Sequence, residues 1–68
     1  MPFVTVTQMA DTLTPEQART LIEKITQACI DVEGERVRPV TVVTLQETLR
    51  PGRVGIGGRI LGEPGQPR

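Results

Sequence analysis

One long amphipathic helix, expected between Thr14 and Gly34, constrains the fold more than any other feature of this sequence. Thr14 is a favourable N-cap, Pro15 suits the first helical position, and Gln17 stands where a capping box requires it. Gly34 is of the residue type that commonly ends a helix. Apolar residues recur at helical spacing on one side, at Ala18, Leu21, Ile22, Ile25, Ala28, Cys29 and Val32. We therefore expect a helix of about 18 residues that buries one face.

Two runs rich in β-branched residues flank this helix. In the first, residues 3–9, Val4 and Val6 alternate with Phe3, Thr5 and Thr7, which predicts a strand. The second, residues 40–46, follows Pro39, and proline is tolerated at the first position of a strand. Residues 33–38 are expected to form a polar connection. Strand, helix and strand predict a β-α-β unit of the α/β (α+β) class, with parallel strands and a right-handed crossover.

The length of the chain limits what this unit can bury. A chain of 68 residues forms one small domain with a marginal core, and such domains are stabilised by disulfides, metals or oligomerisation. Cys29 is the only cysteine, so an intrachain disulfide is excluded, and histidine, the commonest metal ligand, is absent. Oligomerisation is therefore the expected route to stability.

The glycine-rich segment 50–62 has a different character from the rest of the chain. Pro51-Gly52 predicts a turn, and the following glycines favour a tight β-hairpin over a helix. A phosphate-binding loop is not indicated, because no lysine follows these glycines. We expect one domain over residues 1–62 and a flexible tail over residues 63–68.

The charge pattern excludes some functions and leaves one question open. The formal net charge is zero and Phe3 is the only aromatic residue, which argues against nucleic-acid binding. No apolar run approaches the ~20 residues of a membrane span, so no membrane association and a cytoplasmic location are expected. From residue 50 onward only Glu63 opposes four arginines, namely Arg50, Arg53, Arg59 and Arg68. These arginines form either a solvated tail or a set that meets an anionic ligand across a subunit boundary.

Pro2 is the candidate catalytic residue. Removal of Met1 leaves Pro2 with a secondary amine held at the start of a strand, and burial can lower the pKa of such an amine towards neutrality. The amine could then act as a general base. The alternative reading is that a proline at position two only marks the removal of Met1.

Taken together, these residues resemble the tautomerase superfamily, in particular the short subunits similar to 4-oxalocrotonate tautomerase. The resemblance rests on Pro2, on the Thr14-Pro15-Glu16-Gln17 helix start, on the β-α-β length, and on residues 52–58, Gly-Arg-Val-Gly-Ile-Gly-Gly. It implies a hexamer, a trimer of dimers, that acts on a small anionic 2-oxo acid. It further implies that Pro2 moves protons in a keto–enol tautomerisation without a cofactor or a metal.

The sequence departs from the pattern of this family at its arginines. Thr12 and Leu13 stand where the family carries an arginine after the first strand, Thr41 replaces an arginine of the second strand, and Val54 replaces a phenylalanine of the hairpin. The candidate substrate-binding residues are therefore Arg38, Thr41, Arg53, Val54 and Arg59. Alternatively, a different, related subunit supplies the cations in a hetero-hexamer, the chain belongs to a hydratase-dehalogenase, or the chain is a non-catalytic family member.

Overall fold

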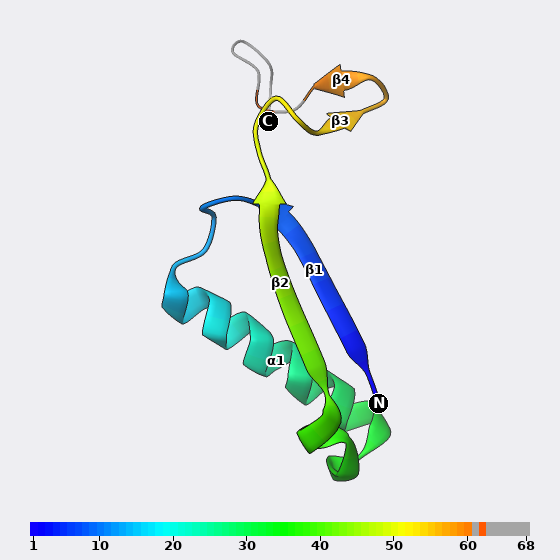
Figure 1. Ribbon diagram of the computed structural model, residues 1–68. Helices are drawn as coiled ribbons and strands as arrows, with labels where there is room; N and C mark the ends of the chain where they lie inside the picture. The colour runs from blue at the N-terminus through cyan, green and yellow to red at the C-terminus, as the bar shows by residue number, and fades with distance from the viewer. Residues whose placement is uncertain (61, 63–68) are drawn as a thin grey trace.

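The computed structural model describes residues 1–60 and 62, in which a β-α-β body carries a small hairpin at one end (Figure 1). The elements in chain order are β1 (Phe3–Met9), α1 (Pro15–Glu33), the 3₁₀ helix η1 (Glu35–Val40), β2 (Val42–Leu49), β3 (Gly55–Ile56) and β4 (Arg59–Ile60). We call residues 1–49 the body, and residues 50–60 and 62 the hairpin arm. The expected β-α-β unit and hairpin are confirmed, while the expected flexible tail, residues 63–68, lies outside the described residues.

The ends of α1 are fixed by local hydrogen bonds. The Gln17 N–H donates to Thr14 Oγ1 at 3.1 Å, and the Thr14 N–H donates to Gln17 Oε1 at 2.9 Å, which completes the expected capping box. At the other end, Gly34 has φ +101° and its N–H donates to the Ile30 carbonyl at 2.8 Å. Because residues with a Cβ rarely adopt this φ, glycine ends the helix here.

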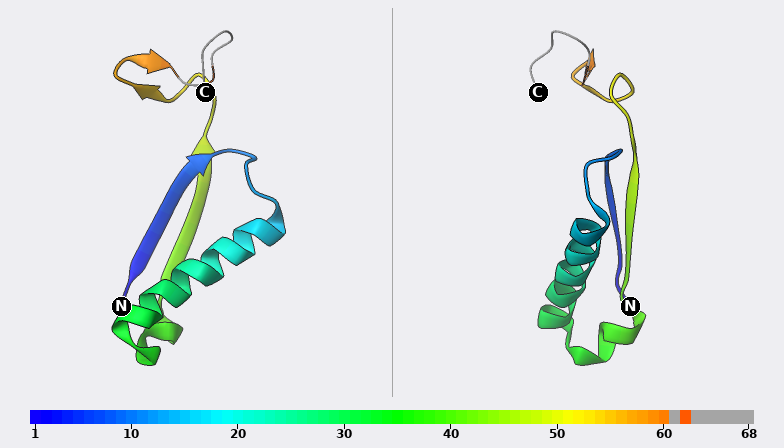
Figure 2. Two further views of the ribbon diagram at one scale, coloured as in Figure 1. Left: turned by 180° about the vertical axis from the view of Figure 1, so that it is seen from behind. Right: turned by 90° about the vertical axis from the view of Figure 1, so that its left-hand side faces the viewer.

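The strands β1 and β2 form a two-stranded parallel sheet with α1 on one side only (Figure 2). The register pairs Phe3 with Val42 and continues to Thr7 and Gln46, after which β2 contains one extra residue before Met9 pairs with Leu49. Side chains on the helix side are half-buried, namely Val4, Val6, Val43 and Leu45. Those on the opposite, uncovered face are exposed, namely Phe3, Thr5, Thr7, Val42, Thr44, Gln46 and Thr48.

The segment between α1 and β2 differs from the expectation. Residues 35–40 form the 3₁₀ helix η1, which includes Pro39, and β2 begins at Val42 rather than at Val40. Thr41 closes the turn, because its N–H donates to the Arg38 carbonyl at 3.4 Å and its hydroxyl donates to the Val37 carbonyl at 2.7 Å. These bonds outweigh the β-propensity of Val40 and Thr41.

The core of the body is small. Among the described residues only Ile30 and Val37 are buried, at 5% and 8% exposed. The radius of gyration is 15.5 Å, whereas a compact chain of this length would have about 11 Å. Val32, expected on the buried stripe, is 87% exposed, because α1 packs against β2 and leaves one flank of the helix uncovered. The described part of the chain contains no helix that is long and apolar enough to cross a membrane.

The hairpin arm projects beyond the C-terminal end of β2 (Figure 1). Its strands are antiparallel and pair Gly55 with Ile60 and Ile56 with Arg59. The two residues between them, Gly57 and Gly58, have φ +59° and +82°. A two-residue hairpin loop with both φ values positive is the type I′ turn, which glycine pairs favour strongly.

Candidate functional site

Pro2 lies immediately before β1 and is fixed by the sheet. The Val42 N–H donates to the Pro2 carbonyl at 2.9 Å, and the Pro2 side chain is half-buried. Met1 is 71% exposed at the tip of the body. Removal of Met1 would therefore place a secondary amine on a rigid backbone at this end of the sheet.

Thr41 is brought to the same place by the strand register. Phe3 pairs with Val42. Pro2, the residue before β1, therefore lies across from Thr41, the residue before β2. The Thr41 hydroxyl donates its proton to the Val37 carbonyl, so it contributes to the closure of η1 and keeps only its acceptor capacity for other groups.

Arg38 lies in η1, three residues before Thr41, and its guanidinium is bound within its own chain. Its Nε lies 2.5 Å from Glu35 Oε1, and its Nη2 donates to Glu35 Oε2 at 3.3 Å and to Gln27 Oε1 at 3.2 Å. The hydrogen bond from Arg38 holds the pKa of Glu35 below its usual value, and the same bond raises the pKa of Arg38. Sequence reasoning missed Glu35, although its i, i+3 spacing from Arg38 is a signal for such a pair in a helical turn.

Exposed apolar residues gather around the same end of the sheet. Phe3 is 69% exposed and its register partner Val42 is 39% exposed, both on the uncovered face, and Val40 at the end of η1 is also 39% exposed. These residues form an apolar surface next to Pro2 at this end of the sheet.

The structure does not bring the hairpin candidates, Arg53, Val54 and Arg59, to Pro2 within one chain. Pro2 lies at the start of the sheet, whereas the hairpin arm follows the end of β2, which at eight residues spans about 26 Å. In the described residues β3 and β4 contact each other and no other helix or strand. Arg53 and Arg59 are exposed and Val54 is half-buried. The candidates thus form two groups, one in the body and one in the hairpin arm.

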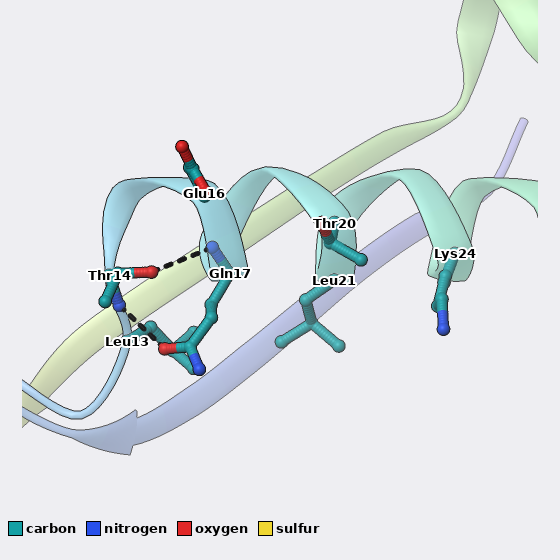
Figure 3. Close-up of a pocket in the computed structure, with 7 residues that line it drawn as sticks. All are labelled: Leu13, Thr14, Glu16, Gln17, Thr20, Leu21 and Lys24. Atoms are coloured by element: carbon teal, nitrogen blue, oxygen red, sulfur yellow. Dashed lines mark hydrogen bonds between the residues drawn. The ribbon is translucent and has the colours of Figure 1, made fainter.

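A hollow of about 560 Å³ lies along the first turns of α1, remote from Pro2 (Figure 3). It is lined by Leu13, Thr14, Glu16, Gln17, Thr20, Leu21 and Lys24. Leu21 and Lys24 point to the same side of the helix, farther along α1 than the capping box at Thr14. None of the candidate site residues lines this hollow, so it belongs to the uncovered flank of α1 rather than to the Pro2 end.

Known proteins resemble this chain over nearly its whole length. The model of a family described as tautomerase enzyme matches residues 2–63. The probable tautomerase K2 of Dickeya dadantii (strain 3937) is 35% identical over 63 residues, which cover 93% of this chain and 91% of that protein. The crystal structure of YwhB, a homologue of 4-oxalocrotonate tautomerase, is similar with a TM-score of 0.77 and 34% identity, covering 91% of this chain and 97% of that one.

Proposed function

This chain belongs to the tautomerase family, and on that premise we propose that it is an isomerase that interconverts the enol and keto forms of a small 2-oxo acid, with Pro2 as the general base. The observation that carries the proposal is the position of Pro2. Its carbonyl accepts a hydrogen bond from the Val42 N–H, and the exposed apolar residues Phe3 and Val42 lie beside it.

The proposed reaction is a proton transfer within one substrate molecule. After removal of Met1, the neutral Pro2 amine accepts the proton of the enol hydroxyl, and the resulting ammonium delivers a proton to a carbon of the conjugated system. The O–H bond breaks and its electron pair forms the C=O bond, while the π electrons of the C=C bond form the new C–H bond and leave a C–C single bond, so atoms and electrons balance without a redox partner. A cation near the developing oxyanion would lower the barrier further.

The proposal includes an assembly of several copies, because the cations of the hairpin arm lie far from Pro2 in one chain. An arm from another subunit could bring Arg53 and Arg59 to the Pro2 end. The small core, the uncovered sheet face and the projecting arm support such an assembly. We propose a hexamer of this chain, with a hetero-hexamer containing a related subunit as the alternative.

Replacement of Pro2 tests the proposed base. Pro2→Ala should lower the enol-to-keto conversion of 2-hydroxymuconate and phenylenolpyruvate by at least about 100-fold, the range typical of a lost general base. The matched control is Pro15→Ala, which changes the same residue type at the exposed start of α1. Intact-mass measurement establishes that Met1 is removed from each protein. Undiminished activity of Pro2→Ala, or an inactive wild-type protein that lacks Met1, would refute the proposal.

A further inference from the structure

In the ion pair between Glu35 and Arg38, the Glu35 carboxylate binds the guanidinium as the carboxylate of a ligand would. Arg38 presents two nitrogens to the two oxygens of one carboxylate, and Gln27 adds a third contact. This two-point contact is the geometry by which arginine recognises carboxylates in general. Both edges of the guanidinium that can hold a carboxylate by two points include Nη2, and Nη2 is bound to Glu35 and Gln27.

Glu35 and Arg38 lie in the row of η1 side chains that ends at Thr41, and the Arg38 guanidinium also contacts Gln27 of α1. In a 3₁₀ helix the side chains at i and i+3 eclipse, so Glu35 and Arg38 share one side, and Thr41 is the next residue in that row. One 3₁₀ turn rises about 6 Å and neighbouring strands lie about 4.8 Å apart. The backbone of Arg38 is therefore at most about 11 Å from that of Pro2, a distance that an extended arginine and a small bound acid can bridge together.

Arg36, the other arginine of η1, does not meet these conditions. It lies two residues before Arg38, about a third of a turn away around a 3₁₀ helix, and therefore outside the row that ends at Thr41. Neither a hydrogen bond nor an ion pair engages its side chain in the described residues. Arg36 can therefore serve as a comparison for an unpaired cation on the same turn.

We propose that Glu35 is a specificity-determining residue, whose carboxylate occupies Arg38 in place of the carboxylate of an anionic substrate and must be displaced when such a substrate binds. This inference rests on the proposed function, because that function supplies the 2-oxo acid. Both side chains are substantially exposed, at 49% for Arg38 and 73% for Glu35, so the exchange of one carboxylate for the other is inexpensive. Glu35 thus weakens binding of carboxylates without preventing it.

The experiment compares two unreactive ligands of similar shape, 3-phenylpropanoate and its uncharged amide, 3-phenylpropanamide. Glu35→Gln should bind the carboxylate about three- to fivefold more tightly than the wild type, the range of a modest exposed ion pair, and should bind the amide unchanged. Arg38→Ala in the Glu35→Gln background should abolish the gain, whereas Arg36→Ala in that background should keep it. Glu33→Gln makes the same change in net charge at the exposed end of α1 and should leave both affinities unchanged.

The outcomes separate this inference from the proposed function. If Glu33→Gln also raised the affinity for the carboxylate, or if the higher affinity of Glu35→Gln persisted without Arg38, the change in affinity would be due to net charge. Either result would overturn the role of Glu35. No gain with Glu35→Gln would overturn it as well. The affinities are measured with unreactive ligands, so they test the role of Glu35 whether or not Pro2→Ala abolishes turnover. The proposed function is tested separately, by the turnover of Pro2→Ala.

Discussion

The body and the hairpin arm of this chain are specified in different ways. The body has a capped helix, a paired sheet and a small core around Ile30 and Val37. The hairpin arm has a well-defined turn at Gly57 and Gly58, but its strands contact no helix or strand of the body in the described residues. Ile56, an apolar residue of the arm, is 66% exposed. The conformation of the arm thus depends on its own residues, while no helix or strand of the body stabilises its position in the part of the chain that the structure describes.

The candidate site residues are also divided between the two regions. The body carries Pro2 and an arginine that is paired with Glu35, whereas the arm carries Arg53 and Arg59 and has no acidic residue between positions 50 and 62. The proposed base in the body and the arginines of the arm would suit a site that two subunits build together.

Subunit mixing should show the largest effect. Pro2→Ala and the double variant Arg53→Ala/Arg59→Ala should each lose about 100-fold in activity when assayed alone, because each lacks one half of the site. After the two are unfolded and refolded together, about one quarter of the wild-type activity should return, because random assembly joins two intact halves in a quarter of the sites.

The control for this experiment mixes the two variants without refolding, so that subunits do not exchange. Activity that stays at the level of the separate variants after refolding together would show that the arm does not complete the site of another copy. Full activity of the arginine double variant by itself would lead to the same conclusion.

Core and arm should respond differently to the loss of an isoleucine side chain. Ile30→Ala should lower the free energy of unfolding by about 3 kcal/mol, because Ile30 is only 5% exposed and its truncation leaves a cavity in the core. Ile56→Ala removes the same atoms from the arm, so its effect should depend on assembly and therefore on protein concentration. Urea unfolding at several concentrations measures both. An Ile56→Ala effect that is large and independent of concentration would mean that the arm packs on its own body.

The helix, the sheet and the turn of the arm could be predicted from the sequence because each depends on neighbouring residues. Thr14 and Gln17 cap each other across three residues, and Gly57-Gly58 determines a two-residue loop by its positive φ values. The parallel register follows from the β-α-β connection, and it places Thr41 across from Pro2.

Other features depend on contacts that the local pattern does not contain. Residues 33–38 were predicted as a polar connection and residues 40–46 as a strand after Pro39, but the bonds from Thr41 to Arg38 and Val37 close a 3₁₀ helix over residues 35–40 instead. Val32 was predicted to be buried because its spacing fits the stripe, yet burial depends on where α1 sits over the sheet. The separation of Arg53 and Arg59 from Pro2 depends on the direction in which the arm leaves β2, which no local pattern determines.

The turn of the arm offers a test with a smaller effect. Gly57→Val should destabilise the hairpin by about 1–2 kcal/mol, because a β-branched residue disfavours φ +59°, whereas Gly57→Asn should be tolerated better, since asparagine adopts this region more readily. The readout is activity together with the mass of the assembly, while the helical circular dichroism of the body serves as the internal control. Equal effects of the two substitutions would contradict a requirement for positive φ at this position.

The smallest effect is expected from the ion pair of the body, and it should depend on pH. The hydrogen bond from Arg38 lowers the pKa of Glu35 from its ordinary value of 4.5. A carboxyl whose pKa is lowered in the folded state stabilises that state above the unfolded pKa, and this stabilisation is lost as the pH falls through the folded pKa. Arg38 stays charged throughout this range, because its pKa is raised. The melting temperature of the wild type should therefore exceed that of Glu35→Gln slightly at pH 7, and the difference should vanish at a pH well below 4.5.

The arm supplies the matched control for this pH dependence, since residues 50–62 contain no acidic side chain that could pair with their arginines. Any difference in melting temperature between the wild type and Arg59→Gln should then stay constant over the same acidic range. If the Arg59→Gln difference also collapsed on acidification, Arg59 would be paired with a carboxylate outside residues 50–62, namely that of Glu63, of the body or of another subunit. Such a result would show that an ion pair stabilises the arm, as one stabilises η1.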